Sequence, residues 1–218
     1  MSGVLGALLD LLFPPRCPFC GKLLRAGEGG LCAKCQEALP WLTGSQGEQR
    51  LEFVSCCVSP LRYQGEVRRS IHRYKFEGIR GYAGVYGTLI AQCVSDRLAG
   101  RYDLITWVPL SPKRRRERGY DQAMLLARAV AAALDGEAVE TLSKVRHTDA
   151  QSGLKGEAER RANVLGVYEI LDGEALAGRK ILLIDDVATT GATLSECARI
   201  LRTAGAEDVV CATLARAR

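Results

Sequence analysis

Two neighbouring carboxylates near the end of the chain are the residues with the most evident chemical use. Asp185 and Asp186 follow a short apolar run, 181–184, and Thr189-Thr190-Gly191 comes shortly after them. Backbone N–H groups of such a loop, and of a helix beginning behind it, attract an anion such as phosphate, and threonine hydroxyls add donors. Carboxylates repel phosphate but suit sugar hydroxyls or bound Mg²⁺. The pattern therefore predicts a site for a phosphorylated sugar.

Two elements must position this site. The run 181–184 follows Gly178 and is too short for a typical helix, which predicts a buried strand of a parallel sheet. Apolar and polar residues over 192–204 recur with the period of an amphipathic helix, and Gly205 is expected to end it. Its expected buried residues are Leu194, Cys197, Ala198 and Leu201, and its expected solvent-facing residues are Ser195, Glu196, Arg199 and Arg202. Ligand sites of open α/β sheets lie at the carboxyl ends of strands.

The acidic pair has two other interpretations. A plain buried strand with a capped helix would leave two carboxylates at a strand end without a partner, which is costly. A Walker B interpretation also places acidic residues after an apolar strand. It lacks its partner, since the sequence contains no G-x-x-x-x-G-K-[ST].

Four cysteines in two C-x₂-C pairs form a second candidate site. Gly21 suits the tight turn after the first pair, and four thiolates at this spacing suit tetrahedral Zn²⁺. The ligands are Cys17, Cys20, Cys32 and Cys35. A closed Cys₄ site leaves no open position, so we expect structural zinc. Disulfides fit a reducing compartment poorly, and free thiols after metal loss are the remaining alternative. The other five cysteines are expected to be structural.

Composition and charge bound the class of protein. The 218 residues are 47% hydrophobic, which allows one full core plus a small module. We expect a helix and zinc module at 1–50 and an α/β domain at 51–218. The apolar stretch 1–13 lacks a basic start and contains Asp10, which favours a docking helix over a signal peptide or membrane span, with attachment to a membrane surface as the minor alternative. A cytoplasmic location is expected. Residues 59–120 carry 13 basic and 5 acidic side chains, and this excess of positive charge could attract polyanions.

The remaining elements alternate between strand and helix. We expect a strand at 54–61, a helix at 64–76, a strand at 103–109, a helix from 121, a strand at 138–142, an extended segment at 167–171 and a strand at 209–214. In the helix 64–76, Arg68, Arg69, Arg73 and Lys75 are expected to point outward. Glycines every third residue over 78–87 predict a loop and a helix with one small face. The order predicts an α/β fold with a mostly parallel, twisted sheet flanked by helices.

A basic segment follows the strand 103–109. Five of the six residues over 113–118 are basic. At a strand end they could reach the crevice beside Asp185, where cations would neutralise a pyrophosphate and its leaving charge. The candidates are Lys113, Arg114 and Arg118, and the alternative is a solvated basic loop.

The stretch Ile184-Asp185-Asp186-Val187-Ala188-Thr189-Thr190-Gly191 resembles the phosphoribosyl-pyrophosphate (PRPP) loop of type I phosphoribosyltransferases. The resemblance implies that the acidic residues hold the ribose hydroxyls and that the Thr-Thr-Gly loop holds the 5′-phosphate. It implies PRPP and Mg²⁺ as ligands, bound by Asp185, Asp186, Val187, Ala188, Thr189, Thr190, Gly191, Ala192 and Thr193.

Segments along nearly the whole chain resemble the ComF family. They are the Cys₄ pairs, 62–65 with 74–76, 108–110, 118–122, Arg146 with 151–154, and 160–164 with the closing acidic loop. The family is phosphoribosyltransferase-like and linked with DNA uptake in competent bacteria. It commonly has Asn where Asp121 stands; Asp keeps the capping oxygen and lacks the amide donor.

Three functions remain open from the sequence. The first is an enzyme in which Asp185 and Asp186, with the basic candidates, move a phosphoribosyl group from PRPP to an unidentified acceptor. The second is a protein that binds single-stranded DNA, alone or with DNA-uptake proteins, through the zinc module and basic segment. There, Tyr63, Tyr74, Phe76 and Tyr120 could stack on bases. The third is a PRPP-sensing regulator without catalysis.

Overall fold

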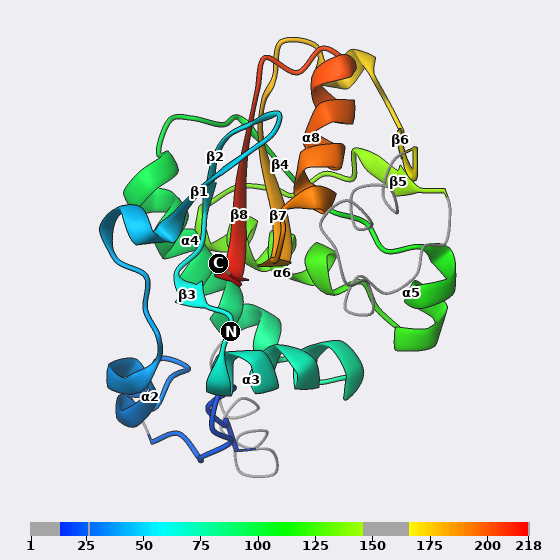
Figure 1. Ribbon diagram of the computed structural model, residues 1–218. Coiled ribbons are helices and arrows are strands. Elements are labelled where there is room, and N and C mark those ends of the chain that lie inside the picture. The colour runs from blue at the N-terminus through cyan, green and yellow to red at the C-terminus, as the bar shows by residue number, and fades with distance from the viewer. Residues whose placement is uncertain (1–13, 26, 146–165, 218) are drawn as a thin grey trace.

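The computed structural model describes residues 14–25, 27–145 and 166–217. Its main sheet has the order β1 (Glu48–Leu51), β2 (Val54–Val58), β8 (Asp208–Arg216), β7 (Lys180–Ala188) and β4 (Leu104–Trp107), with β3 (Leu61–Arg62) also paired to β8 (Figure 1). Strands β2, β8, β7 and β4 run parallel, and β1 is antiparallel to β2. The predicted mostly parallel sheet is confirmed.

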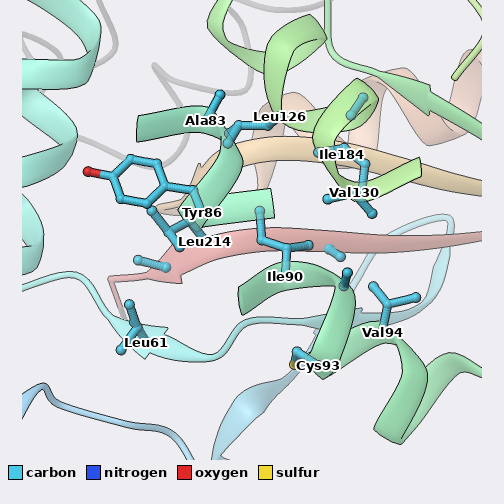
Figure 2. Close-up of a cluster of buried hydrophobic side chains, with 14 of the residues drawn as sticks. Leu61, Ala83, Tyr86, Ile90, Cys93, Val94, Leu126, Val130, Ile184 and Leu214 are labelled. Carbon is cyan, nitrogen blue, oxygen red and sulfur yellow. The ribbon is translucent and has the colours of Figure 1, made fainter. Parts of the chain in front are cut away.

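Helices cover both faces of this sheet. Helices α4 (Tyr82–Leu98) and α6 (Gln122–Ala133) pack on one face, and α8 (Ala192–Thr203) on the other, near the pair β5 (Leu142–Lys144) and β6 (Tyr168–Ile170) (Figure 1). Figure 2 shows Tyr86, Ile90 and Val94 of α4 and Leu126 and Val130 of α6 packed with Ile184 of β7 and Leu214 of β8. Leu183 of β7 is buried in the opposite core with Cys197 of α8. Alternate residues of β7 therefore supply two cores, as expected of a strand covered on both faces.

The cysteine module lies at one end of the molecule, beside α3 (Gly65–Phe76) (Figure 1). It contains α2 (Ala33–Ala38) and leads through the 3-10 turn Gly44–Gly47 into β1. Two further short elements are α5 (Pro112–Arg118) and the 3-10 turn Glu174–Leu176.

The glycine repeat forms a loop and a helix, as predicted, but of its two helical glycines Gly84 is exposed and Gly87 alone makes the expected close contact. Gly87 lies in α4 where that helix crosses α6, and a Cβ at Gly87 would lie 2.4 Å from the Ala129 Cβ. The close approach of the two helices therefore requires a residue without a side chain at this position.

Several predicted boundaries were wrong. The strand expected at 54–61 is two strands, since Pro60 has no N–H to donate in a ladder. The strand expected at 138–142 is a single bridge from Ala138 to Ile105, followed by β5. The basic segment is the helix α5 rather than a loop. Ser111 caps it by accepting the Arg114 N–H, and Gly119, at φ +76°, ends it.

One face assignment in α8 was also wrong. Glu196 was expected in solvent, but it is 4% exposed. It accepts the Gly166 N–H at 3.1 Å and two bonds from Arg199 at 2.8 and 2.9 Å. These bonds satisfy a buried carboxylate that would otherwise be costly.

Some predictions concern residues outside the described parts of the chain. They are the helix at 1–13 and the segments carrying Arg146, 151–154 and 160–164. Among the described residues, none of the helices has the length and apolar character needed to cross a membrane. The domain division at residue 50 and the cytoplasmic location stay predictions.

Candidate functional site

The four cysteines of the two C-x₂-C pairs come together. The sulfur atoms of Cys17, Cys20, Cys32 and Cys35 all lie within 4.8 Å of one another. The Cys20 and Cys32 sulfurs are 3.6 Å apart, close to the about 3.8 Å that two thiolates at 2.3 Å span on a tetrahedral zinc ion. Gly21 turns the chain at φ +74°, and its N–H donates to the Cys17 carbonyl. The residues therefore fit a structural zinc ion.

Backbone groups prepare at least one of these thiols to bind metal. Burial opposes ionisation of Cys17. Hydrogen bonds from the backbone of Cys32, Cys20 and Phe19 outweigh it and lower the pKa of Cys17 to about 7. A thiol with such a pKa is readily available as the thiolate that zinc requires.

The first cysteine pair is fastened to α3. Arg73 donates to the carbonyls of Pro18 and Phe19 at 3.0 and 2.9 Å, and the Ser70 hydroxyl donates to the Pro18 carbonyl. The Phe19 side chain is fully buried, with its ring 5.7 Å from that of Tyr86. The module is thus joined to the core of the α/β domain.

The acidic pair lies inside β7 rather than after it. The sequence placed the strand end at residue 184, but β7 continues to Ala188 and pairs Asp185 with Thr213. Trp107, the last residue of β4, lies beside Ile184. The loop that leaves β4 and the acidic pair therefore meet at the same edge of the sheet, as the parallel arrangement requires.

A lysine that the sequence placed in solvent reaches the acidic pair. The Lys75 Nζ lies 2.6 Å from Oδ1 of Asp186, and Asp186 is 3% exposed. The other oxygen, Oδ2, is buried without a hydrogen-bond partner among the described residues. Burial, then the charge of Asp186, raise the pKa of Asp185 to about 8, while Lys75 and the Asp186 N–H oppose the rise. A buried carboxylate oxygen without a partner fits a bound cation or hydroxyl.

The hydroxyl-rich loop leads directly into α8. Gly191 caps this helix at φ +81°, a conformation that a side chain would strain, and its carbonyl accepts the Ser195 N–H. The Thr190 hydroxyl accepts the Ala192 N–H at 3.4 Å. Thr189, Thr190 and Thr193 are half-buried. The N–H groups of a helix's first turn have no acceptor within the helix, so this loop can hold an anion.

The three basic candidates have different surroundings. Lys113 is exposed, and Arg114 is half-buried. Arg118 donates to the Gln122 side chain at 2.8 Å, and its guanidinium lies 4.9 Å from the Phe76 ring centroid. Burial lowers the pKa of Arg118, and the charge of Asp186 acts in the opposite direction. Arg118 is therefore within electrostatic reach of the acidic pair.

Lys144 is a further cation near the site, and the sequence gave no signal for it. It is 9% exposed, with its Nζ 5.1 Å from the Tyr168 ring centroid. Burial and the charge of Arg114 lower the pKa of Lys144 to about 8, while the charges of Cys197 and Asp185 act to raise it. It is thus electrostatically linked to both basic and acidic candidates.

Asp121 is a capping residue, as predicted. One oxygen accepts the Met124 N–H of α6 at 3.1 Å, and the other accepts the Leu110 N–H at 2.8 Å. It thereby ties the loop after β4 to the start of α6. Burial raises its pKa in spite of these bonds.

Comparison with known proteins decides the family. Residues 121–218 match the phosphoribosyl transferase domain and residues 8–47 the double zinc ribbon domain. DNA utilization protein YhgH of Salmonella typhi is 32% identical, over 91% of this chain and 84% of its own. The chain belongs to the ComF family.

Two further similarities accompany the match to this family. Competence protein F of Haemophilus influenzae is 29% identical, over 93% of this chain and 97% of its own. A solved structure of the allosteric regulatory enzyme of purine biosynthesis aligns with 61% of this chain and 25% of that chain, at 22% identity and a TM-score of 0.42. The two domain matches make this ComF-family chain a phosphoribosyltransferase-like protein with a zinc ribbon, and its relatives are named for competence and DNA utilization.

The aromatic residues of this ComF-family chain differ from the sequence hypothesis. Tyr74 and Tyr120 are 0% and 5% exposed, so neither is available to stack on a base. Phe76 is 60% exposed, and Tyr63 is half-buried. The Tyr74 hydroxyl instead donates to the Gln122 carbonyl at 2.9 Å.

Proposed function

We propose that this ComF-family chain binds PRPP together with Mg²⁺ at the carboxyl edge of β7. The observation that carries the proposal is a buried oxygen of Asp186 that has no partner within the described parts of the chain, beside Asp185 and shortly before the Gly191 turn into α8. Carboxylate oxygens suit sugar hydroxyls or a magnesium ion, and the helix start suits a phosphate. These two chemistries together are those of a phosphorylated sugar.

Each group has a distinct role in this proposal. Asp185 and Asp186 hold the ribose hydroxyls and the metal side of the ligand, and the 189–193 loop holds the 5′-phosphate. Arg118, within electrostatic reach of Asp186, and the neighbouring Lys113 and Arg114 compensate the charge of the pyrophosphate. Bound Mg²⁺ would neutralise the same phosphate oxygens.

The reaction class that follows is phosphoribosyl transfer to a nitrogen nucleophile. The bond between ribose C1 and the pyrophosphate oxygen breaks, and pyrophosphate leaves with the electron pair. A new bond forms between C1 and the acceptor nitrogen, which loses its proton. Cations placed beforehand around the leaving group lower the barrier to this step.

Calorimetry with PRPP and Mg²⁺ tests the binding step. The double variant Asp185→Asn with Asp186→Asn is expected to lose about 100-fold or more in affinity, because each lost charge-assisted contact is worth about 1.5–3 kcal/mol. Asp96→Asn, on the exposed surface of α4, is the matched control. Unchanged affinity in the double variant would reject the proposal. Pyrophosphate release measured with nucleobases and amines then tests turnover.

A second candidate function rests on the outward face of α3. An open cavity of about 500 Å³ is lined there by Gly65, Arg68, Arg69, His72, Arg73 and Glu77. Three of its six lining residues are arginines. Arg73 also holds the cysteine module, so this basic surface is continuous with the zinc ribbon. It suits the phosphates of single-stranded DNA.

Salt dependence tests this second function. Retention of a single-stranded oligonucleotide should weaken steeply as salt rises, with a slope of about −0.7 per phosphate contact. Arg68→Ala with Arg69→Ala should flatten that slope, whereas Arg179→Ala, which pairs with Asp103, should not. An equal slope in both variants would count against DNA binding at α3.

A further inference from the structure

We infer that the Lys75 ammonium is a built-in counter-ion of the acidic pair, occupying the charge position that a divalent cation takes when ligand binds. The inference rests on the proposed function insofar as the ligand brings a divalent cation. It gives a role to Lys75, which lies in the family-like segment 74–76 but outside the PRPP-loop motif, and it predicts competition between this side chain and metal.

The position of Lys75 is fixed by the end of α3. Tyr74, its neighbour, is fully buried and donates to the Gln122 carbonyl at 2.9 Å. The Lys75 Nζ then reaches Asp186 Oδ1 at 2.6 Å, and the lysine side chain stays 22% exposed. One end of the ion pair is thus buried in the site, and the other keeps access to solvent.

The pair is incomplete as a purely structural salt bridge. Only Oδ1 of Asp186 is occupied, and Oδ2 is buried without a partner among the described residues. Buried carboxylates in a permanent ion pair normally have their remaining lone pairs satisfied as well. Asp185 lies next to it, with one oxygen accepting the Asp186 N–H at 2.7 Å. The arrangement leaves carboxylate oxygens directed to something besides Lys75.

A lysine suits an exchangeable role. An ammonium is a point charge on a flexible stem, whereas an arginine would grip both carboxylate oxygens in a fixed fork. The Lys75 ammonium contacts Oδ1 of Asp186, and Oδ2 has no partner among the described residues. Asp186 would hold a divalent cation through Oδ2, in competition with the ammonium for the same carboxylate. An ammonium displaced in this way would be free to pair with the phosphates of the ligand.

Metal binding without PRPP tests the inference directly. Mn²⁺ is titrated into the full, zinc-loaded chain, and bound metal is followed by electron paramagnetic resonance. Lys75→Met should bind Mn²⁺ about tenfold more tightly, since a competing charge at contact distance is removed. Lys180→Met removes a surface lysine that pairs with Glu207 and should leave the affinity unchanged. Lys75→Met with Asp186→Asn should lose the gain.

Equal or weaker Mn²⁺ binding by Lys75→Met would overturn the inference, because a merely structural lysine gives no gain. If that variant does not fold, the wild-type chain decides the question. Saturating Mg²⁺ should make the Lys75 amine react several-fold faster with an acylating reagent, read by mass spectrometry, whereas Lys180 should not change. A constant rate at Lys75 would overturn the inference.

The two proposals fail separately. Tighter Mn²⁺ binding by Lys75→Met in a chain that does not bind PRPP would keep the counter-ion and reject the PRPP site. PRPP binding by a chain in which Lys75→Met does not change the Mn²⁺ affinity would keep the PRPP site and reject the counter-ion.

Discussion

The cysteine module and the acidic edge of the sheet prepare their ligand atoms in opposite ways. Four sulfurs converge within 4.8 Å, three of the four cysteines are buried, and the set fits one tetrahedral ion. At the acidic edge, one carboxylate oxygen is held by Lys75, another lacks a partner among the residues that the structure describes, and the threonines beside them remain half-buried. A closed set of ligands serves stability, whereas an open set is suited to ligands that come and go.

Helix α3 is the element that touches both regions. Ser70 and Arg73 contact the carbonyls of the first cysteine pair, and Lys75 contacts Asp186. The two regions are therefore structurally joined over about one and a half turns of one helix. The following predictions, from the largest expected effect to the smallest, either separate the regions or sharpen their contrast.

Removing the zinc ligands should have the largest effect. Cys17→Ser with Cys20→Ser should abolish zinc binding, which in zinc-dependent modules is worth about 10 kcal/mol or more at neutral pH. Zinc content by mass spectrometry and limited proteolysis of residues 14–47 check this. Cys56→Ser, half-buried in β2, is the control and should keep its zinc. A module that resists protease without zinc would show that the four cysteines do not stabilise it by holding metal.

The substitution Phe19→Ala should have the next largest effect. Its side chain is fully buried against Tyr86, so truncation should cost about 3–5 kcal/mol of the free energy of unfolding. Urea denaturation measures the loss. Phe53→Leu, at a 49% exposed position, should stay within about 0.5 kcal/mol. An equal effect of the two changes would mean that the module is not packed on the core.

Asp121→Ala tests how the loop beside the acidic edge is held. Two backbone N–H groups, of Met124 and Leu110, would lose their acceptor, at a cost of about 1–2 kcal/mol. Asp121→Asn keeps one acceptor oxygen and should cost less. Thermal melting of the three proteins ranks them, and a fully stable alanine variant would refute the capping role.

Taken per pH unit, the smallest effect should be the change of stability with pH. The pKa of Asp185 is raised to about 8 from 3.8, so between those values the folded chain holds a proton that the unfolded chain has lost. Stability should therefore fall as pH rises through this window, by at most about 1.4 kcal/mol per pH unit. Asp185→Asn should remove that part of the slope in urea midpoints taken at pH 5, 7 and 9. Identical slopes would show that Asp185 is ionised throughout.

The parts predictable from sequence are those whose signal is contiguous. Asp185, Asp186 and Gly191 follow one another along a strand and turn, and each cysteine pair spans four residues, so spacing alone predicts the chemistry. The helix α5 was missed although its signals were present, since Ser111, Pro112 and Gly119 are a cap, a first-turn proline and a terminating glycine.

The parts that could not be predicted depend on contacts between distant segments. Lys75 and Asp186 are far apart in the chain, and the outward position on a helical wheel ignores how far a lysine stem can reach past the helix end. Glu196 is buried because Gly166 and Arg199 supply donors, which helical periodicity does not indicate. Lys144 lies on a three-residue strand that carries no clear pattern.

The hold of α3 on both regions has a consequence for genetics. A substitution at Ser70 or Arg73 would loosen the first cysteine pair. By letting α3 tilt, it would also displace Lys75 from Asp186. Loss-of-function alleles from the zinc ribbon and from the acidic edge of the sheet would then share one phenotype. Complementation assays alone would group them together, and separate measurements of metal content and of PRPP affinity would distinguish them.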